Sequence, residues 1–150
     1  MYPPGVFRSK LAENDISKVV SLQAEVMPNP WSEQAFKSSI KVGDGCYTLT
    51  RGDEIVAVAV VGQVFDEAEL LTIAVDKREQ GQGLGTELLA DLMSVLKSQS
   101  AKQCMLEVME GNDAAVSLYQ RIGFKPVGKR KAYYKTEQGI FDALVMRIDY

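Results

Sequence analysis

The sequence predicts a mixed α/β fold with a mostly antiparallel central sheet and helices on both of its faces. Three observations carry this prediction. An apolar strand-like segment over residues 70–75 runs into a glycine-spaced loop, and leucines at helical spacing follow that loop. Residues 103–109 are almost continuously apolar, which is typical of an interior strand. Shorter β-rich segments between turn residues lie before and after these two.

The first part of the chain is predicted as one strand followed by two helices. Residues 6–11 form the strand, and Asn14 or Asp15 caps a first helix whose apolar residues lie on one side as far as Met27. The prolines that follow Met27 end this helix. Ser32 is the predicted N-cap of the second helix.

Trp31 is the only tryptophan of the chain and stands directly before this cap, while Phe36 lies in the first turn of the helix. The spacing predicts a hydrophobic staple between the two side chains. The alternative role for Trp31 is a wall of a substrate groove between the two helices.

Two turns predict an antiparallel meander before the glycine loop. Residues 46–50 and 55–65 are rich in β-forming residues and are joined by Arg51-Gly52-Asp53-Glu54, which is typical of a hairpin turn. A bend at Asp66-Glu67 leads into a third strand over residues 69–75. Three antiparallel strands therefore precede the loop.

The chain after the loop is predicted as helix, strand, helix and a closing pair of strands. The strand over residues 103–109 follows the first of these helices in a right-handed crossover. Asn112 caps the next helix, which Gly123 ends. The closing strands cover residues 124–134 and 141–148. The predicted order is β-α-α-β-β-β-α-β-α-β-β.

Length and composition limit the class of protein. With 150 residues, of which 46% are hydrophobic and 25% are charged, the chain is predicted to form a single domain over residues 1–150. No apolar run is long enough to span a membrane, and the N-terminus lacks the pattern of a signal peptide. A formal net charge of −3 argues against a nucleic-acid-binding surface. We expect a cytoplasmic protein that binds neither nucleic acid nor membrane.

Histidine is absent, and the two cysteines are isolated in the sequence. Cys46 and Cys104 lie in apolar strand-like segments, which predicts buried free thiols rather than a disulfide or a metal site. Without histidine, His-dependent triads and most zinc or iron catalytic centres are excluded. Catalysis would then use carboxylates, Tyr, Lys, Ser or Cys, and no metal is expected.

The chain is organised around a loop with glycines at positions 81, 83 and 85. These glycines let successive backbone N–H groups approach a bulky ligand, and the helix that begins there adds donors and the positive end of its dipole. Such a loop suits a phosphate or a pyrophosphate. The alternative is that the glycines only turn the chain from strand to helix. The spacing matches neither a triphosphate-binding loop nor a dinucleotide-binding fingerprint.

Glu107 is the single charged residue in its apolar strand. A buried carboxylate at this place is suited to take a proton from an alkylammonium group near neutral pH. The alternative is a glutamate that leans out into solvent at the strand end. Glu67 and Glu69, on the strand before the loop, are rival candidates for a base.

Tyr119 lies on the helix that follows the Glu107 strand. A phenol, with an ordinary pKa of about 10, can protonate a thiolate leaving group and is itself protonated at rest. The alternative is a core residue, because Tyr119 shares a helix face with Ala115 and Ile122. Asn112 is first of all a helix cap, and its amide could also bind a carbonyl or hydroxyl of a ligand.

Taken together, three segments resemble the Gcn5-related N-acetyltransferase (GNAT) family. They are Ile73-Ala74-Val75 with Gln80-Gly81-Gln82-Gly83-Leu84-Gly85, then Leu106-Glu107-Val108, then Asn112-Asp113-Ala114-Ala115 with Leu118-Tyr119-Gln120-Arg121-Ile122-Gly123-Phe124. The resemblance covers essentially the whole chain and is closer to the RimI branch, the ribosomal-protein alanine N-acetyltransferases. Pro30-Trp31-Ser32, Tyr133-Tyr134 and Asp142-Ala143-Leu144-Val145-Met146 add to it.

This resemblance implies an acetyl-CoA-dependent N-acetyltransferase in which acetyl-CoA inserts its pantetheine arm into a splayed gap between two strands. Glu107 would deprotonate the incoming amine, and Tyr119 would protonate the departing thiolate. The residues that would hold acetyl-CoA are Ile73, Ala74, Val75, Gly81, Gln82, Gly83, Leu84, Gly85, Thr86 and Asn112. Trp31 and Tyr134 would contact the acceptor.

The implied reaction transfers acetyl to the α-amine of a protein N-terminus, of the ribosomal-protein N-terminal-alanine type, by direct attack in a ternary complex. No covalent acetyl-enzyme is expected, since neither cysteine has a histidine to activate it. The chain departs from the branch in residues 26–30, at Met109 and at Lys135, where a peptide would bind. Another peptide, a free amino acid or a small amine are therefore alternative acceptors, and a non-catalytic acyl-CoA-binding module is a further alternative.

Overall fold

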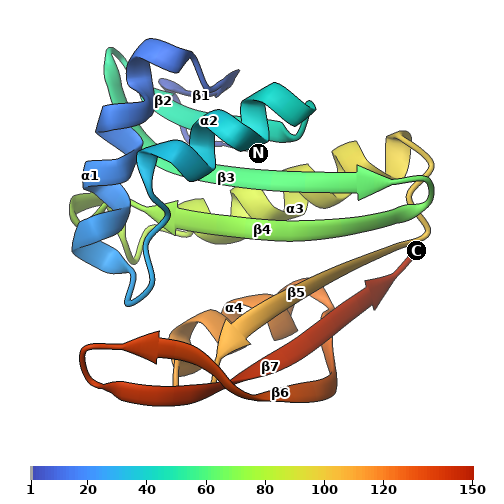
Figure 1. Cartoon of the computed structure of the whole chain (residues 1–150). Coiled ribbons are helices and arrows are strands. Elements are labelled where there is room, and N and C mark those ends of the chain that lie inside the picture. Colours follow the sequence, from blue (N-terminus) through green and yellow to red (C-terminus); the bar gives the residue numbers. More distant parts are fainter. Residues whose placement is uncertain (1) are drawn as a thin grey trace. The chain divides into compact units, whose positions relative to one another are not determined.

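The computed structural model describes residues 2–150 of the chain (Figure 1). The helices are α1 (Ile16–Val26), α2 (Glu33–Val42), α3 (Leu84–Ser98) and α4 (Asp113–Ile122). The strands are β1 (Val6–Lys10), β2 (Gly45–Arg51), β3 (Glu54–Val64), β4 (Glu67–Val75), β5 (Gln103–Met109), β6 (Lys125–Thr136) and β7 (Gly139–Asp149). Their order along the chain is the predicted one, with short 3₁₀ turns added at Glu13–Asp15 and Lys77–Glu79.

The strands form a seven-stranded sheet in the order β1-β2-β3-β4-β5-β7-β6. The pairs β1–β2, β2–β3, β5–β7 and β6–β7 are antiparallel, whereas β4 and β5 are parallel. A parallel pair needs a long crossover connection, and α3 supplies it between these two strands. The prediction of a mixed α/β fold with a mostly antiparallel sheet is confirmed.

The chain divides into two compact units that interleave in sequence. Unit 1 comprises Met1–Gly62 and Leu71–Leu88, and unit 2 comprises Gln63–Leu70 and Leu89–Tyr150. Strands β3 and β4 and helix α3 each contribute residues to both units. The assignment of residues 1–150 to a single domain stays a prediction. No helix within residues 2–150 is long and apolar enough to cross a membrane.

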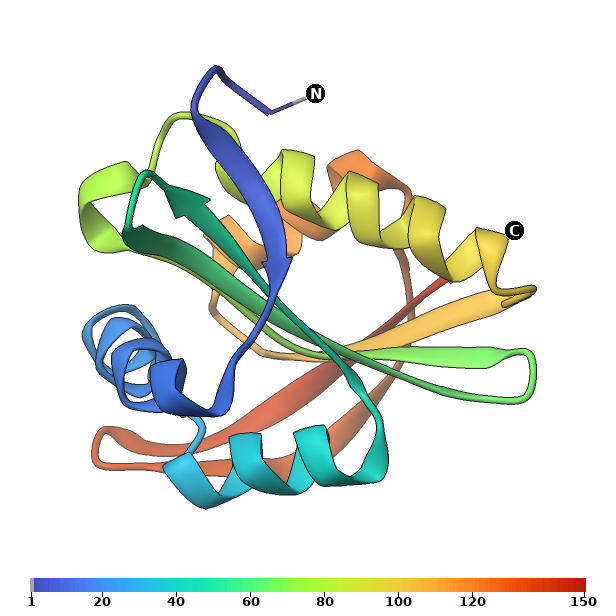
Figure 2. The same ribbon diagram turned by 90° about the horizontal axis from the view of Figure 1, so that it is seen from above.

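Unit 1 has a hydrophobic core between its two N-terminal helices and its strands. Figures 1 and 2 show α1 and α2 in one layer beside strands β2 and β3. The buried members of this core are Leu11, Ile16, Val19, Leu22, Phe36, Cys46, Val58, Val60 and Ala74. Apart from Leu11, which follows β1, they come from both helices and from three strands, so the core fixes the helices against the sheet of this unit.

Helix α2 begins as its sequence predicts. The Ser32 hydroxyl accepts a hydrogen bond from the Ala35 backbone N–H at 3.1 Å. The rings of Trp31 and Phe36 lie 5.2 Å apart between centroids, which confirms the hydrophobic staple. Gly43 ends the helix with a φ of 89°, a conformation that glycine adopts without strain.

The predicted cap of α1 is wrong in its mechanism. Asp15 occupies the N-cap position, but its side chain makes no capping hydrogen bond. The preceding 3₁₀ turn places Asp15 at φ −101° and ψ 0°, whereas capping side chains need extended backbone to reach the first-turn N–H groups. The carboxylate instead pairs with Lys18 at 3.3 Å.

Unit 2 is built on β5, which pairs in parallel with residues 67–70 of β4 and antiparallel with β7. The Asn112 Oδ1 atom accepts a hydrogen bond from the Ala115 N–H at 3.4 Å and so begins α4. Gly123, with a φ of 121°, ends it. Both boundaries confirm the prediction. Cys104 in β5 and Cys46 in unit 1 are buried free thiols, also as predicted.

Strand β6 stands at the edge of the sheet and carries features that discourage further pairing. Pro126 has no N–H to offer a neighbouring strand. The register against β7 shifts between Arg130 and Tyr134, where Ala132 has a φ of 53°. The rest of the strand carries exposed lysines. These features protect the open edge of the sheet from pairing with another strand.

Candidate active site

The glycine loop joins β4 to α3 in unit 1. Gly81 and Gly83 have φ values of 83° and 82°, which residues with a side chain rarely adopt. A Cβ atom built on either glycine would meet no atom of residues 2–150 within 4 Å. The glycines thus supply a backbone conformation, and the space beside them is open to a ligand.

The first turn of α3 adds hydrogen-bond donors to this loop. The Glu87 N–H donates to the Gly83 carbonyl at 3.0 Å. The N–H groups of Leu84, Gly85 and Thr86 precede this bond and have no acceptor one turn back in the helix. An anion at a helix N-terminus uses such donors together with the helix dipole. The loop therefore has the geometry that a pyrophosphate needs, and its occupation by acetyl-CoA stays a prediction.

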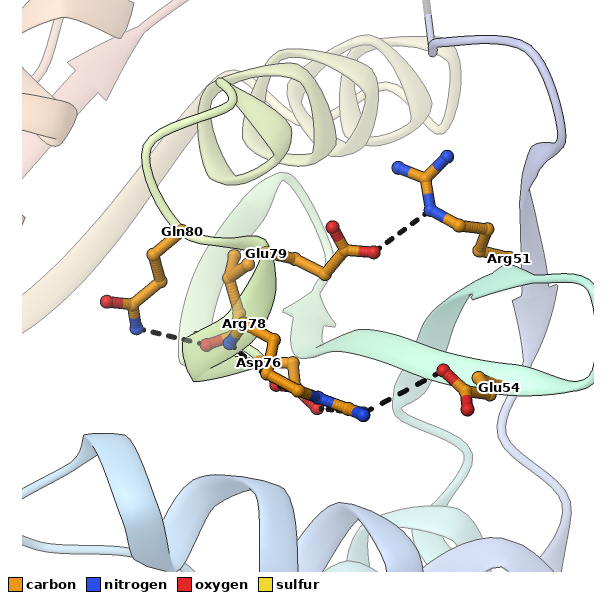
Figure 3. A network of polar contacts seen from close by, with 7 residues as sticks. Arg51, Glu54, Asp76, Arg78, Glu79 and Gln80 are labelled. Atoms are coloured by element: carbon orange, nitrogen blue, oxygen red, sulfur yellow. Dashed lines mark hydrogen bonds and ion pairs between the residues drawn. The ribbon is translucent and has the colours of Figure 1, made fainter.

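A polar network shapes the chain where β4 leads into this loop (Figure 3). The Asp76 carboxylate accepts a hydrogen bond from the Arg78 N–H at 2.9 Å and lies 3.3 Å from the guanidinium of the same residue. The Arg78 side chain is the main reason that the pKa of Asp76 lies below its ordinary value. The same guanidinium lies 3.8 Å from Glu54 at the start of β3.

Two further contacts complete this network. The Arg51 guanidinium pairs with Glu79 at 2.9 Å, and the Gln80 amide donates to the Val75 carbonyl at 3.1 Å (Figure 3). This network was not among the predictions from the sequence. Two features of the sequence could have indicated the network. Alternating charges stand next to the glycine loop, and Arg51 and Glu54 lie in the β2–β3 hairpin.

Glu107 lies in β5 of unit 2 with a side chain that is 17% exposed. The Arg130 Nε atom lies 3.2 Å from its carboxylate. The Tyr133 hydroxyl hydrogen-bonds to the same carboxylate, and this bond is the main reason that the pKa of Tyr133 is raised. Glu107 therefore does not lean out into solvent, and it has both an opposite charge and a hydrogen-bond donor beside it.

The approach of both Arg130 and Tyr133 to Glu107 was not predicted from the sequence. In a regular strand, residues three positions apart point to opposite faces of the sheet. The irregularity at Ala132 changes this alternation, and the Ala132 N–H is held by the Asp142 carboxylate at 2.8 Å. The guanidinium of Arg130 also lies over the Tyr133 ring at 5.5 Å. In the sequence, Asp142 on the paired strand is the local signal for the irregularity at Ala132.

Tyr119 is a buried residue of α4 whose ring lies 6.0 Å from that of Phe124. Burial, with a smaller effect from Tyr134, raises the pKa of Tyr119 well above its ordinary value. The hydroxyl therefore stays protonated at neutral and mildly alkaline pH. The core position is confirmed, and the phenol keeps the proton that an acid would donate. Its catalytic role stays a prediction.

The remaining candidates lie where the sequence placed them. Tyr134 is half-buried in β6, and burial followed by the charge of Glu107 raises its pKa to about 12. Glu67 and Glu69 are exposed residues of β4. Glu69 pairs with Met105 in β5, which lies on the same face of the strand as Glu107, and its role as a rival base stays a prediction. The described part of the chain holds no cluster of three or more His, Cys, Asp or Glu residues that could bind a metal.

Comparisons with known proteins agree with this architecture. The model of the Acetyltransferase (GNAT) family matches residues 16–124. The [ribosomal protein bS18]-alanine N-acetyltransferase of Escherichia coli K12 is 35% identical over 140 residues, which are 93% of this chain and 95% of that protein.

Solved structures of similar proteins have the same fold as this chain. The crystal structure of the ribosomal-protein-S18-alanine N-acetyltransferase from Escherichia coli has a TM-score of 0.89 and 34% identity, and the match covers 96% of this chain and 93% of that one. Arabidopsis thaliana NAA60 in complex with acetyl-CoA has a TM-score of 0.85 over 96% of this chain and 98% of that one, and at 15% identity it shows the fold alone. The chain belongs to the GNAT family and is an N-acetyltransferase.

Proposed function

We propose that this enzyme transfers the acetyl group of acetyl-CoA to the N-terminal α-amine of a protein, and that an N-terminal alanine of a ribosomal protein is its acceptor. The single observation that carries the proposal is the 35% identity with the Escherichia coli [ribosomal protein bS18]-alanine N-acetyltransferase over nearly the whole length of both chains. The compartment we propose is the cytoplasm, because two buried free thiols suit a reducing environment.

The proposed reaction is a direct transfer in a ternary complex. The acceptor nitrogen attacks the thioester carbonyl carbon, the C–N bond forms, and the C–S bond breaks to release the CoA thiolate. Glu107 takes a proton from the acceptor nitrogen, and Tyr119 gives a proton to the thiolate sulfur. Because the thioester is already activated, the larger contribution to rate is the positioning of a neutral amine beside it.

The proposal assigns binding to residues of both units. In unit 1, the backbone of Ile73, Ala74 and Val75 pairs with the pantetheine arm, and the pyrophosphate binds to Gly81, Gln82, Gly83, Leu84, Gly85 and Thr86. The open space beside Gly81 and Gly83 supports this assignment. Asn112 in unit 2 adds a contact to acetyl-CoA. Trp31 and Tyr134 are the proposed contacts of the acceptor.

The experiment that tests the function is single-turnover release of CoA thiol from acetyl-CoA with a panel of acceptors. The panel contains short peptides that begin with Ala, Ser, Met or Gly, beside free amino acids and polyamines. We expect release with unblocked peptides, loss of release when the peptide N-terminus is blocked, and strong reduction in Glu107→Gln.

Two results would contradict the proposed acceptor. Thiol release with free amino acids or polyamines alone would assign the enzyme to small amines. Binding of acetyl-CoA without release by any member of the panel would favour an acyl-CoA-binding role for this chain.

A further inference from the structure

Gln23 is a polar side chain with no exposed surface in the interior of unit 1. It lies on α1 beside the apolar core residues Val19 and Leu22. Burial of an amide costs free energy unless both of its ends are hydrogen-bonded. An apolar side chain of the same length would fill this interior position without the cost of burying an amide. The contribution of Gln23 beyond packing is therefore its two hydrogen bonds.

Both ends of the Gln23 amide have partners in other elements. Its Nε2 atom donates to the Thr72 hydroxyl at 2.9 Å, and its Oε1 atom accepts from the Trp31 backbone N–H at 2.9 Å. The Thr72 hydroxyl in turn lies 3.7 Å from the Met27 sulfur. Gln23 therefore bridges the end of α1, the start of α2 and strand β4.

Gln23 holds the segment over residues 27–31 at both ends, because its backbone carbonyl accepts from the Met27 N–H at 2.9 Å and its side chain accepts from the Trp31 N–H. Pro28 and Pro30 have no N–H, so the backbone of the segment has few donors by which it can be held. The Trp31 N–H is one of those few, and Gln23 is its acceptor. On the other side, Thr72 is a buried residue of β4 and directly precedes Ile73.

We propose that Gln23 is a positioning residue of the acceptor site, because its buried amide holds Trp31 and the segment over residues 27–31 in register with the acetyl-CoA-binding part of β4. This inference rests on the proposed function, which assigns Trp31 to the acceptor and residues 73–75 to acetyl-CoA. Gln23 itself touches neither substrate in that assignment and acts through Trp31 and Thr72.

The first test needs no enzymatic activity. Since Trp31 is the only tryptophan, its fluorescence reports on this segment alone. Gln23→Met keeps the length of the side chain and removes both hydrogen bonds. In the folded variant, we expect the rate constant for quenching of Trp31 fluorescence by acrylamide to rise at least about 2-fold. Local opening of the segment then no longer has to break the hydrogen bond between the Trp31 N–H and Gln23. Wild-type quenching in folded Gln23→Met would overturn the inference, whatever the acceptor is.

The second test separates a positioning role from a general loss of stability. In Gln23→Met, we expect the KM for an Ala-first peptide to rise about 10-fold, while kcat and the Kd for acetyl-CoA change less than about 2-fold. Equal loss of kcat and of acetyl-CoA affinity, with unchanged peptide KM, would overturn the inference.

A matched pair of threonines keeps the test decisive if Gln23→Met does not fold. Thr72→Val removes the hydroxyl that Gln23 uses, and Thr72→Ser keeps it. Thr48→Val makes the same change at a buried threonine of β2 outside this network. We expect a KM increase of about 3-fold in Thr72→Val and wild-type values in Thr72→Ser and Thr48→Val. Equal effects of Thr72→Val and Thr48→Val would overturn the inference.

The inference and the proposed function fail in different ways. If the wild-type enzyme acetylates a small amine and no peptide, the proposed acceptor is wrong, and the same comparison is made with the KM for that amine. An unchanged amine KM in Gln23→Met would then overturn the inference as well, whereas an increased one would support it.

Discussion

The two units of this enzyme use polar side chains in different ways. In unit 1, the buried polar side chains are the neutral groups Gln23, Ser39, Thr48 and Thr72, and the glycine loop offers backbone donors. In unit 2, the candidate site consists of titratable groups around Glu107 and Tyr119. We infer from this difference that proton transfer depends on unit 2, whereas acetyl-CoA binding depends mainly on unit 1.

This division has a physical reason. Amides, hydroxyls and backbone N–H groups keep their charge state over the working pH range, so a binding site built from them does not weaken as pH changes. Proton transfer needs groups that do titrate. We therefore expect substitutions in unit 1 to change dissociation constants and KM, and substitutions at Glu107 and Tyr119 to change kcat.

The largest expected effect comes from Glu107→Gln. The amide keeps the shape of the side chain and cannot accept the proton of the acceptor amine, so kcat should fall by about 10²- to 10⁴-fold. The Kd for acetyl-CoA, measured by calorimetry, should stay within about 2-fold of the wild-type value.

The control for Glu107→Gln is Glu110→Gln. Glu110 is an exposed glutamate of the same unit that pairs with Lys129 at 3.0 Å. This variant should keep wild-type kcat. Wild-type turnover in Glu107→Gln together with a large loss in Glu69→Gln would show instead that Glu69 is the base.

Tyr119→Phe should lower kcat by about 10- to 100-fold, because the thiolate then takes its proton from water. The raised pKa of Tyr119 means that the protonated form persists as pH rises above the ordinary pKa of a phenol. The ratio of wild-type to variant kcat should therefore be the same at pH 7 and at about pH 10.5, where a phenol with the ordinary pKa would be mostly ionised.

Tyr150→Phe is the matched control for Tyr119→Phe. Tyr150 is another tyrosine of unit 2. Partial burial raises its pKa to about 12, and its hydroxyl contacts the Met93 sulfur at 3.0 Å. The control should leave kcat unchanged. A ratio for Tyr119→Phe that shrinks toward high pH would mean that Tyr119 loses its proton within the working range.

The fold was largely predictable because local chemistry sets most of its boundaries. The Ser32 and Asn112 caps and the Gly123 stop each depend on residues within a few positions, and the sequence contains them all. The cap of α1 was not predictable from residue types, since the 3₁₀ turn before it gives Asp15 a backbone conformation from which its side chain cannot cap.

The surroundings of the candidate site were less predictable, because they depend on long-range pairing. Periodicity places Gln23 on the inner side of α1, but its partner Thr72 lies in a distant strand. Similarly, Arg130 and Tyr133 both reach Glu107 because the register against β7 shifts between Arg130 and Tyr134. Patterns along the chain indicate which face of an element is buried, and they do not indicate which distant residue meets it.

A smaller effect is expected for Gly83→Ala, which tests the binding side of the comparison. The φ of 82° at this position disfavours any Cβ, at a cost of about 1–2 kcal/mol that the loop can relieve by moving its N–H groups. The Kd for acetyl-CoA should rise about 10-fold, while single-turnover kcat at saturating acetyl-CoA stays within about 2-fold of wild type.

Gly52→Ala is the control for this substitution. Gly52 lies in the β2–β3 turn of the same unit, has a φ of 62° and has equally open surroundings among the described residues. It should cost similar stability and leave acetyl-CoA binding unchanged. Loss of kcat without loss of affinity in Gly83→Ala would contradict a purely binding role for the loop.

Asn112 gives the smallest expected effect and the sharpest test of the comparison, because the proposal assigns this unit 2 residue to acetyl-CoA. Asn112→Ser keeps a helix cap of similar strength and removes the amide, so the Kd for acetyl-CoA should rise about 3-fold with little change in the free energy of unfolding. Asn112→Ala should also lower that free energy by about 1 kcal/mol, measured by urea denaturation. Wild-type affinity in Asn112→Ser would mean that Asn112 only caps α4. Acetyl-CoA binding would then be assigned to unit 1 alone, and Tyr134 would be the one residue of unit 2 with a proposed binding role.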